Sequence, residues 1–309
     1  MSSTDLVDPM ASVRAYLEAE KASNTRKAYG SDWADFTAWC STADLQSLPA
    51  EPATVARYLA QLADVGRKTS TIQRRVAAIR NFHKIAGFEP PTSTEGVKAT
   101  MRGIRRTLRS KPVRKKPTTA GLLAKVLEHL PKTLAGIRDR AILLVAFAGA
   151  LRRSEVVALQ LEDIERRPNG ILLHLDHSKS DQEGKGAALP VPNGRELRPV
   201  EALDAWLTAA GITSGPVFRE VDRHGRVGTG ALSDRSVARI VKRAIAAAGL
   251  DEKDFSGHSM RAGFITSSLD RRADPLLVKK QSRHAKLDTL LIYDRRDNEL
   301  EEHFSGDFL

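Results

Sequence analysis

The sequence contains a single cysteine, Cys40, among its 309 residues, and aromatic residues make up only 5% of it. One cysteine excludes a disulfide within the chain and any zinc site built from several cysteines. This shortage of thiols is typical of proteins in a reducing compartment. Cys40 follows the stretch DFTAW, which predicts a small core or helix-end residue.

Long hydrophobic runs are also missing. The longest apolar stretch, AILLVAFAGAL at residues 141–151, is too short to cross a bilayer and predicts a buried helix. The opening MSSTDLVDPM lacks the basic start and the apolar run of a secretory signal peptide. We therefore expect a cytoplasmic protein.

Acidic residues are in deficit. The chain has 49 lysines and arginines against 38 aspartates and glutamates, which gives a formal net charge of +11. Such an excess of positive charge favours a polyanionic partner, most simply nucleic acid, and a nucleoid-associated location. The alternative is that the charge only keeps the protein soluble.

The N-terminal part of the chain predicts helices and little else. Tyr29, Trp33 and Phe36 recur at helical spacing after the capping residues of the stretch SNT, and Pro52 and Gly66 mark the start and end of a further helix. The pattern predicts a compact domain over residues 1–108, with helices near residues 11–22, 23–45, 51–66, 68–88 and 93–108.

A basic segment follows. Residues 102–116 hold eight lysines and arginines and no acid, and Pro112 and Pro117 interrupt any helix. This composition predicts an interdomain linker over residues 109–117 that self-repulsion keeps extended unless phosphates neutralise it. The alternative is a merely solvated tether.

The second domain is expected over residues 118–297, before a tail at 298–309. Strand-like stretches at 170–177 and 187–192 flank a polar, glycine-containing turn at 178–186, which predicts a small antiparallel sheet. Helical patterns surround it, at 119–130, 133–151, 201–211, 233–250, 257–273, 274–282 and 287–297. The fold class is therefore mainly α with a small antiparallel β-sheet, an α+β arrangement.

Several short stretches carry residues suited to phosphodiester chemistry without metal. Such chemistry needs a nucleophile, fixed positive donors for the phosphate oxygens and an acid for the leaving oxygen. In GALRRSE, Arg152 and Arg153 follow an expected buried helix, and Glu155 lies where it can hold the side chain of Arg152. On its own this stretch is more typical of a solvated helix end.

Further candidates follow along the chain. Lys179 and Lys185 lie in the turn between the two strands, where a lysine of lowered pKa could donate a proton. In GHSMRAGF a histidine and an arginine, His258 and Arg261, are three residues apart on one helical face. The final candidates are His284 and, nine residues later, Tyr293, which could be either a core aromatic or a nucleophile.

The order of these stretches is more specific than any one of them. GALRRSE, SKSDQ, GHSMRAGF and RHAKLDTLLIY together resemble the tyrosine recombinase (phage-type integrase) family, in its simpler two-domain form. The resemblance covers nearly the whole chain. It implies a helical core-binding domain, a basic linker and a catalytic domain that closes with the tyrosine.

The resemblance also implies roles. Arg152, rather than Arg153, and Arg261 would clamp the scissile phosphate, because the family arginine follows the Gly-x-Leu turn and precedes the acidic residue by three. Tyr293 would attack the phosphorus and leave a 3′-phosphotyrosyl link and a free 5′ hydroxyl. The proton donors and acceptors around this step would be Lys179 as general acid, His258 beside the nucleophile and His284 on a phosphate oxygen.

No metal, ATP or other cofactor is implied, because the covalent link conserves the bond energy. Two features depart from the family pattern. Arg283 stands before His284, where many relatives have glycine, and Lys185 is a second candidate for the acid.

The expected partner is a double-stranded DNA recombination site, held between the two domains. Candidate DNA contacts are Arg74, Arg75, Arg80, Arg105, Arg106, Arg235 and Arg239, on expected helix faces and at the start of the basic segment. The tail carries Phe304, Phe308 and Leu309 behind polar residues, and it is expected to dock on a neighbouring subunit in a tetramer on two DNA sites. A tail that stays disordered or packs on its own subunit is the alternative.

The expected function is site-specific DNA recombination or integration. Two other hypotheses remain at this point: a type IB-like topoisomerase, which shares the chemistry, and a catalytically silent DNA-binding protein on the same scaffold.

Overall fold

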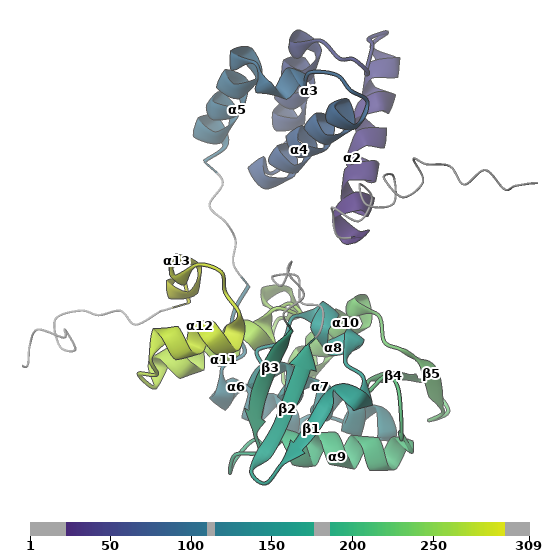
Figure 1. Cartoon of the computed structure of the whole chain (residues 1–309), viewed down its shortest axis with the longest axis vertical. Helices are drawn as coiled ribbons and strands as arrows, with labels where there is room; N and C mark the ends of the chain where they lie inside the picture. Colours follow the sequence, from purple (N-terminus) through teal and green to yellow (C-terminus); the bar gives the residue numbers. More distant parts are fainter. Residues whose placement is uncertain (1–22, 110–114, 176–185, 294–309) are drawn as a thin grey trace, which may run out of the picture. The chain divides into compact units, whose positions relative to one another are not determined.

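The computed structural model (Figure 1) describes residues 23–109, 115–175 and 186–293. The chain divides into two compact units, residues 1–113 and 114–309. Each unit is described by itself below. No helix in the described ranges is long and apolar enough to cross a membrane.

The N-terminal unit is helical, as the sequence predicts. Its elements are α2 (Ser23–Thr42), α3 (Pro52–Asp64), α4 (Thr69–Ile85), the 3-10 turn η1 (Pro91–Ser93) and α5 (Glu95–Leu108). The helix expected at 11–22 lies outside the described residues.

Aromatic side chains fill the centre of this unit. The rings of Phe36 and Tyr58 meet edge to face with centroids 5.0 Å apart, and Trp33 stacks on Phe82 at 4.7 Å. Cys40 is 1% exposed and belongs to this core. Because such large rings bury much apolar surface, they account for the tight packing of α2 against α3 and α4.

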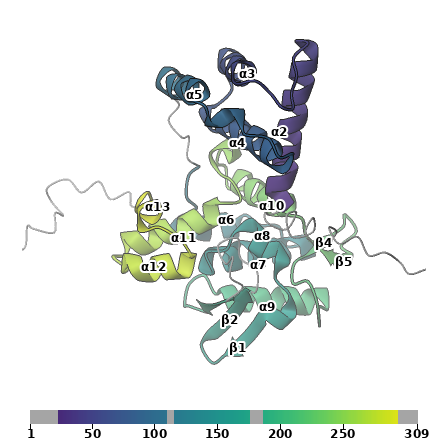
Figure 2. The same ribbon diagram turned by 45° about the horizontal axis from the view of Figure 1, so that its top comes forward.

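The C-terminal unit surrounds the well-buried helix that AILLVAFAGAL predicts. Its helices are α6 (Ala120–Glu128), α7 (Leu134–Ala148), α8 (Arg153–Ala158), η2 (Leu161–Asp163), α9 (Pro199–Ala210), α10 (Asp234–Ala247), η3 (Glu252–Asp254), α11 (Ser259–Asp270), α12 (Pro275–Ser282) and α13 (Leu287–Leu291). Helices α7 and α9 pack side by side, as do α11 and α12 (Figures 1 and 2).

The predicted small antiparallel sheet is present and gains a third strand. Its order is β1 (Ile164–Arg167), β2 (Gly170–Leu175) and β3 (Ala187–Pro192). Ile171 pairs with Val191 and Leu173 with Leu189, so the apolar residues of alternate positions lie on one buried face.

A second, two-stranded sheet was not predicted. It joins β4 (Arg219–Val221) to β5 (Val227–Ala231) through a turn at Gly225, whose φ is 80°. The strands are short and β5 is almost wholly exposed, so no alternation of apolar and polar residues marks them in the sequence.

The segment before α6 is fixed to the C-terminal unit. The backbone nitrogen of Lys116 donates to the carbonyl of Asp254 at 2.7 Å, and that of Thr118 donates to the carbonyl of Ser259 at 2.9 Å. Helix α11 approaches so closely that a Cβ on Gly263 would lie 1.8 Å from the Thr118 carbonyl oxygen. Residues 116–118 are thus tied to the start of α11, where His258 precedes the helix and Arg261 lies in its first turn.

Candidate active site

The turn between α7 and α8 positions the first arginine. Ala150 has a φ of 46°, which reverses the chain and leaves Arg152 as the residue that caps α8. Glu155 accepts both from the Arg152 backbone nitrogen at 2.8 Å and from Arg152 Nη1 at 2.6 Å. Glu155 is 4% exposed, so its carboxylate is held rigidly and in turn orients the guanidinium.

The second arginine comes from the first turns of α11. Arg261 is 1% exposed, and its Nη1 donates to the carbonyl of Ala150 at 2.7 Å. Among the described residues, its Nε has no hydrogen-bond partner. A buried guanidinium with a spare donor is suited to an anionic ligand, since an unpaired buried polar group is costly.

The nucleophile candidate meets a histidine. His258, directly before α11, places Nε2 2.9 Å from the phenol oxygen of Tyr293. Tyr293 follows α13 and packs with Ile265, Leu269 and the fully buried Leu290. This apolar contact fixes the ring and leaves its hydroxyl directed at the imidazole.

His284 lies in the loop between α12 and α13 and completes the cluster. Its Nδ1 is 2.8 Å from Ser282 Oγ and 3.4 Å from Arg261 Nη2, and its ring centroid lies 6.0 Å from that of Tyr293. The His284 imidazole therefore contacts the Arg261 guanidinium and lies near the Tyr293 ring.

The cluster is strongly positive. Among the described residues, the guanidiniums of Arg152, Arg261 and Arg283 surround a single carboxylate, that of Glu155. Burial, with the charges of Arg152 and Arg283, lowers the pKa of Arg261 to about 9, so it remains protonated at neutral pH. Uncompensated positive charge at a partly buried point favours a bound phosphate.

The same surroundings keep both histidines neutral near pH 7. Burial, and then the charges of Arg261 and Arg152, lower the pKa of His284 to about 4. Desolvation and the charge of Arg261 lower the pKa of His258 below its ordinary value of 6.5, although the residue is exposed. A neutral His258 can accept a proton from the Tyr293 phenol.

The structure thus brings together five residues that lie far apart in the sequence: Arg152, His258, Arg261, His284 and Tyr293. Lys179 and Lys185, the two candidates for the acid, lie outside the described residues, between the ends of β2 and β3. The sequence did not identify Ala150 or Ser282, and it left Arg283 without a role. The left-handed backbone at Ala150 and Arg283 gives no signal in residue type, because both positions carry a side chain.

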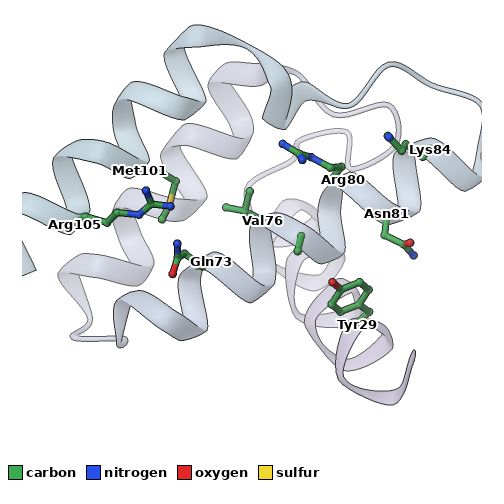
Figure 3. A pocket seen from close by; sticks show the side chains of 9 residues that line it. Tyr29, Gln73, Val76, Arg80, Asn81, Lys84, Met101 and Arg105 are labelled. Carbon is green, nitrogen blue, oxygen red and sulfur yellow. The ribbon is translucent and has the colours of Figure 1, made fainter. Parts of the chain in front are cut away.

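Four of the five predicted DNA contacts of the N-terminal unit separate into two groups. Arg80 and Arg105 line an open pocket of about 470 Å³ on α4 and α5, together with Gln73, Asn81 and Lys84 (Figure 3). The pocket lining contains no acidic residue. Its amides and cations suit base edges and phosphates.

Arg74 and Arg75 belong to the other group. Arg75 is 8% exposed, ion-pairs with Asp35 and also contacts the Tyr58 hydroxyl. The expectation that Arg75 reaches a DNA groove therefore conflicts with its burial, and this side chain instead ties α4 to α2 and α3. Arg74 is half exposed and forms a bidentate salt bridge with Asp32.

The other predicted contacts, Arg106 on α5 and Arg235 and Arg239 on α10, are exposed. Arg239 donates to Ser236 at 3.3 Å.

Comparisons with known proteins agree with this fold. The family model of the phage integrase family matches residues 119–299, and that of the phage integrase N-terminal SAM-like domain matches residues 14–88. The chain therefore belongs to the phage integrase family, and it is a tyrosine-type site-specific DNA recombinase.

Two curated relatives illustrate the likeness. The integrase/recombinase XerD homologue of Selenomonas ruminantium is 42% identical and spans 87% of this chain and 80% of its own length. A tyrosine recombinase of Synechococcus elongatus is 34% identical, over 94% of this chain and 91% of its own.

Two solved structures share the fold. A lambda integrase dimer bound to a COC′ core site has a TM-score of 0.63 and 19% identity, over 96% of this chain and 80% of that one. XerH recombinase bound to a difH substrate before cleavage has a TM-score of 0.58 and 19% identity, over 84% and 72%.

Proposed function

We propose that the protein exchanges DNA strands by direct attack of Tyr293 on a backbone phosphate. The observation that carries this proposal is the 2.9 Å contact between His258 Nε2 and the Tyr293 hydroxyl, beside two arginines held in place. The tyrosine oxygen forms a bond to phosphorus as the bond from phosphorus to the 5′ oxygen breaks. The phenol proton passes to His258, and a 3′-phosphotyrosyl link and a 5′ hydroxyl result.

Arg152 and Arg261 bind the non-bridging phosphate oxygens in this proposal. Arg152 is 23% exposed, so its guanidinium can reach a ligand while Glu155 holds it in place. Arg261 lies deeper and offers its unpaired Nε. Fixed donors of this kind stabilise the extra negative charge of the transition state, because they need no reorganisation when it forms.

His284 acts as a neutral hydrogen-bond partner of the phosphate. Its low pKa keeps it uncharged, and its contact with Arg261 places it at the same oxygens. The proton for the departing 5′ oxygen comes from Lys179 or, alternatively, Lys185. Attack of a 5′ hydroxyl from a partner duplex on the phosphotyrosine then reverses the step and joins the new strands.

The N-terminal unit contributes DNA binding. We assign this role to the pocket of Arg80, Arg105, Gln73 and Asn81, with Lys84 on the phosphate backbone (Figure 3). Arg106, Arg235, Arg239 and the half-exposed Arg74 are further phosphate contacts. The affinity then falls steeply with salt, because each neutralised phosphate releases counterions.

Assembly is the last part of the proposal. The C-terminal unit has an apolar groove of about 1010 Å³ between β3 and the helices α11 and α12, lined by Leu189, Phe264, Leu277 and Val278. Leu277 is 65% exposed. The tail of a neighbouring subunit, with its two phenylalanines and final leucine, matches this groove in chemistry, and four such contacts close a ring on two duplexes of nucleoid DNA.

One experiment tests the chemistry. The protein is incubated with a nicked duplex that loses its short 5′-hydroxyl fragment after cleavage, which traps the covalent complex. Wild type is expected to yield a protein–DNA adduct and Tyr293→Phe none. A wild type that binds its own site without any adduct would leave the silent DNA-binding protein as the correct reading.

A second comparison separates recombination from relaxation. The proposal requires product exchange between two duplexes that carry the site. Relaxation of a supercoiled plasmid without any exchange between two sites would instead favour a topoisomerase.

A further inference from the structure

Arg283 is the residue of the cluster that the chemistry above leaves without a task. It ends α12 in a left-handed conformation, with φ 54° and ψ 43°. This conformation is unfavourable for residues with a Cβ and is usually taken by glycine. A side chain kept at such a position implies that its contacts offset the backbone strain.

The Arg283 side chain crosses to the turn that precedes α8. Its Nη2 lies 2.6 Å from Glu155 Oε2, and its Nη1 donates to the carbonyl of Gln281 at 3.0 Å. Longer contacts, of 3.4 and 3.5 Å, reach the carbonyls of Ala150 and Gly149. One guanidinium therefore ties the loop that carries His284 to the turn that carries Arg152.

The link also runs in the other direction. Arg152 Nη2 donates to the backbone carbonyl of Arg283 at 3.3 Å, while Arg152 Nη1 donates to Glu155 Oε1 at 2.6 Å. Arg152 is therefore held by two acceptors, a carbonyl and a carboxylate. The carbonyl belongs to Arg283, and the carboxylate, that of Glu155, is held by the Arg283 side chain. Arg152, Glu155 and Arg283 therefore each contact the other two.

A direct role for Arg283 on the phosphate does not fit this geometry. Its guanidinium is ion-paired with the Glu155 carboxylate at 2.6 Å, whereas among the described residues that of Arg261 hydrogen-bonds only to a carbonyl and a histidine. Both of its terminal nitrogens are already committed to Glu155 and to backbone carbonyls. Its Nε has no hydrogen-bond partner among the described residues, but a two-donor grip on a phosphate would require these contacts to be given up.

We propose that Arg283 is a positioning residue, which locks Arg152 and the His284 loop into one cleavage-ready arrangement through Glu155. This inference rests on the proposed function of the cluster. Glycine would allow the same left-handed turn, but only a side chain such as that of Arg283 can also link the His284 loop to Glu155. A misplaced Arg152 lowers the rate without abolishing DNA binding, because most DNA affinity comes from other phosphates.

The test compares Arg283→Gly with a matched control, Arg198→Gly. Glycine accepts the left-handed backbone, so it removes only the side chain. Arg198 has a φ of 46° and precedes α9 on the exposed surface, and its contacts in the described part of the chain, with Glu201 at 3.2 Å and with the Arg195 carbonyl, lie outside the cluster. Arg283→Gly is expected to slow adduct formation about 100-fold with unchanged DNA affinity and salt dependence, and Arg198→Gly to behave as wild type.

Two further variants show whether Arg283 acts through Glu155. Arg283→Lys keeps the charge but not the planar fork, so it is expected to restore the rate in part. Glu155→Gln and Arg283→Gly together are expected to cost little more than Glu155→Gln alone, because both remove the same link. Fully additive losses would contradict action through Glu155.

Other outcomes overturn the inference directly. Cleavage by Arg283→Gly at the wild-type rate would remove any positioning role, and a weaker, less salt-dependent DNA affinity would make Arg283 a phosphate ligand. The side-chain ¹⁵N resonance of Arg152 gives a readout without cleavage: it should move in Arg283→Gly and stay in place in Arg198→Gly. If wild type forms no adduct, the proposed function fails, while this resonance still decides the positioning role.

Discussion

The His258 imidazole and the Tyr293 hydroxyl, 35 positions apart in the chain, lie within 2.9 Å of each other. Tyrosine is a weak nucleophile while it keeps its proton, because the ordinary pKa of a phenol is near 10. In the proposed mechanism, the neutral imidazole at hydrogen-bond distance accepts this proton. The pairing makes acid sensitivity of the cleavage step the most direct prediction.

We expect the cleavage rate to fall with decreasing pH through a pKa below 6.5. The pKa of His258 is lowered by desolvation and by Arg261, so the ring is neutral at pH 7 and loses its acceptor only when protonated at lower pH. Single-turnover adduct formation at limiting protein reports this pKa for the free enzyme. His258→Asn should remove the acid limb and lower the rate about 10²- to 10⁴-fold. An unchanged pH profile in this variant would show that another group causes the fall in rate at low pH.

The adjacent arginines Arg152 and Arg153 should differ sharply. Arg152→Ala removes a donor that Glu155 orients, and we expect a loss of about 10²- to 10³-fold in the rate of adduct formation. Arg153→Ala is the control, because Arg153 is exposed at the start of α8 and no phosphate role is assigned to it. Equal losses in the two variants would show that general positive charge, rather than a fixed donor, drives the step.

The difference between these two arginines shows how far the sequence reaches. The resemblance to the recombinase family, through the Gly-x-Leu turn, implies Arg152 rather than Arg153, and helical periodicity predicts the helix that begins after His258 and carries Arg261. Short-range patterns carry that information. The contact of Arg152 with the Arg283 carbonyl joins positions 131 apart, and no local pattern encodes it.

Arg75 shows the same limit in the N-terminal unit. On a helical projection it lies near Arg74, and both look like solvated cations. Arg75 is buried and Arg74 half exposed because Asp35 on α2 and Tyr58 on α3 contact the Arg75 guanidinium. Likewise β4 and β5 pair without an apolar alternation, so the second sheet becomes visible only in three dimensions.

Arg80 and Arg75, both on α4, should therefore respond in opposite ways to replacement. Arg80→Ala is expected to weaken DNA binding and reduce the slope of log affinity against log salt by about one, with little change in stability. Arg75→Ala removes the guanidinium that pairs with Asp35 and contacts the Tyr58 hydroxyl, although the hydrogen bond from Tyr58 to Asp35 remains, and it should lower the free energy of unfolding by about 1–3 kcal/mol. Salt titrations of binding and urea unfolding measure the two effects. A stable Arg75→Ala protein that binds DNA weakly would restore Arg75 as a contact.

Removal of residues 299–309 tests assembly separately from chemistry. The truncated protein should still form the tyrosine adduct on a nicked duplex, because the cluster closes at Tyr293. It should fail to hold two duplexes in one complex, as followed by native gel electrophoresis or light scattering. Leu277→Asp, in the proposed receptor groove, should have the same effect from the opposite side of the contact. Unchanged assembly in both variants would contradict tail docking between subunits.

The close approach of α11 to the segment before α6 sets the last prediction. A methyl group at Gly263 would overlap the Thr118 carbonyl oxygen, so Gly263→Ala forces the backbone to shift and should cost about 1–3 kcal/mol of stability in the C-terminal unit. Gly121→Ala is the matched control: it lies in helix α6 of the same unit, and nothing surrounds its added Cβ within 4 Å. Urea unfolding of both variants measures the difference. Because Thr118 is hydrogen-bonded to Ser259, next to His258, we also expect Gly263→Ala to slow adduct formation. A Gly263→Ala protein as stable and active as Gly121→Ala would show that this segment can move away from α11 at no cost.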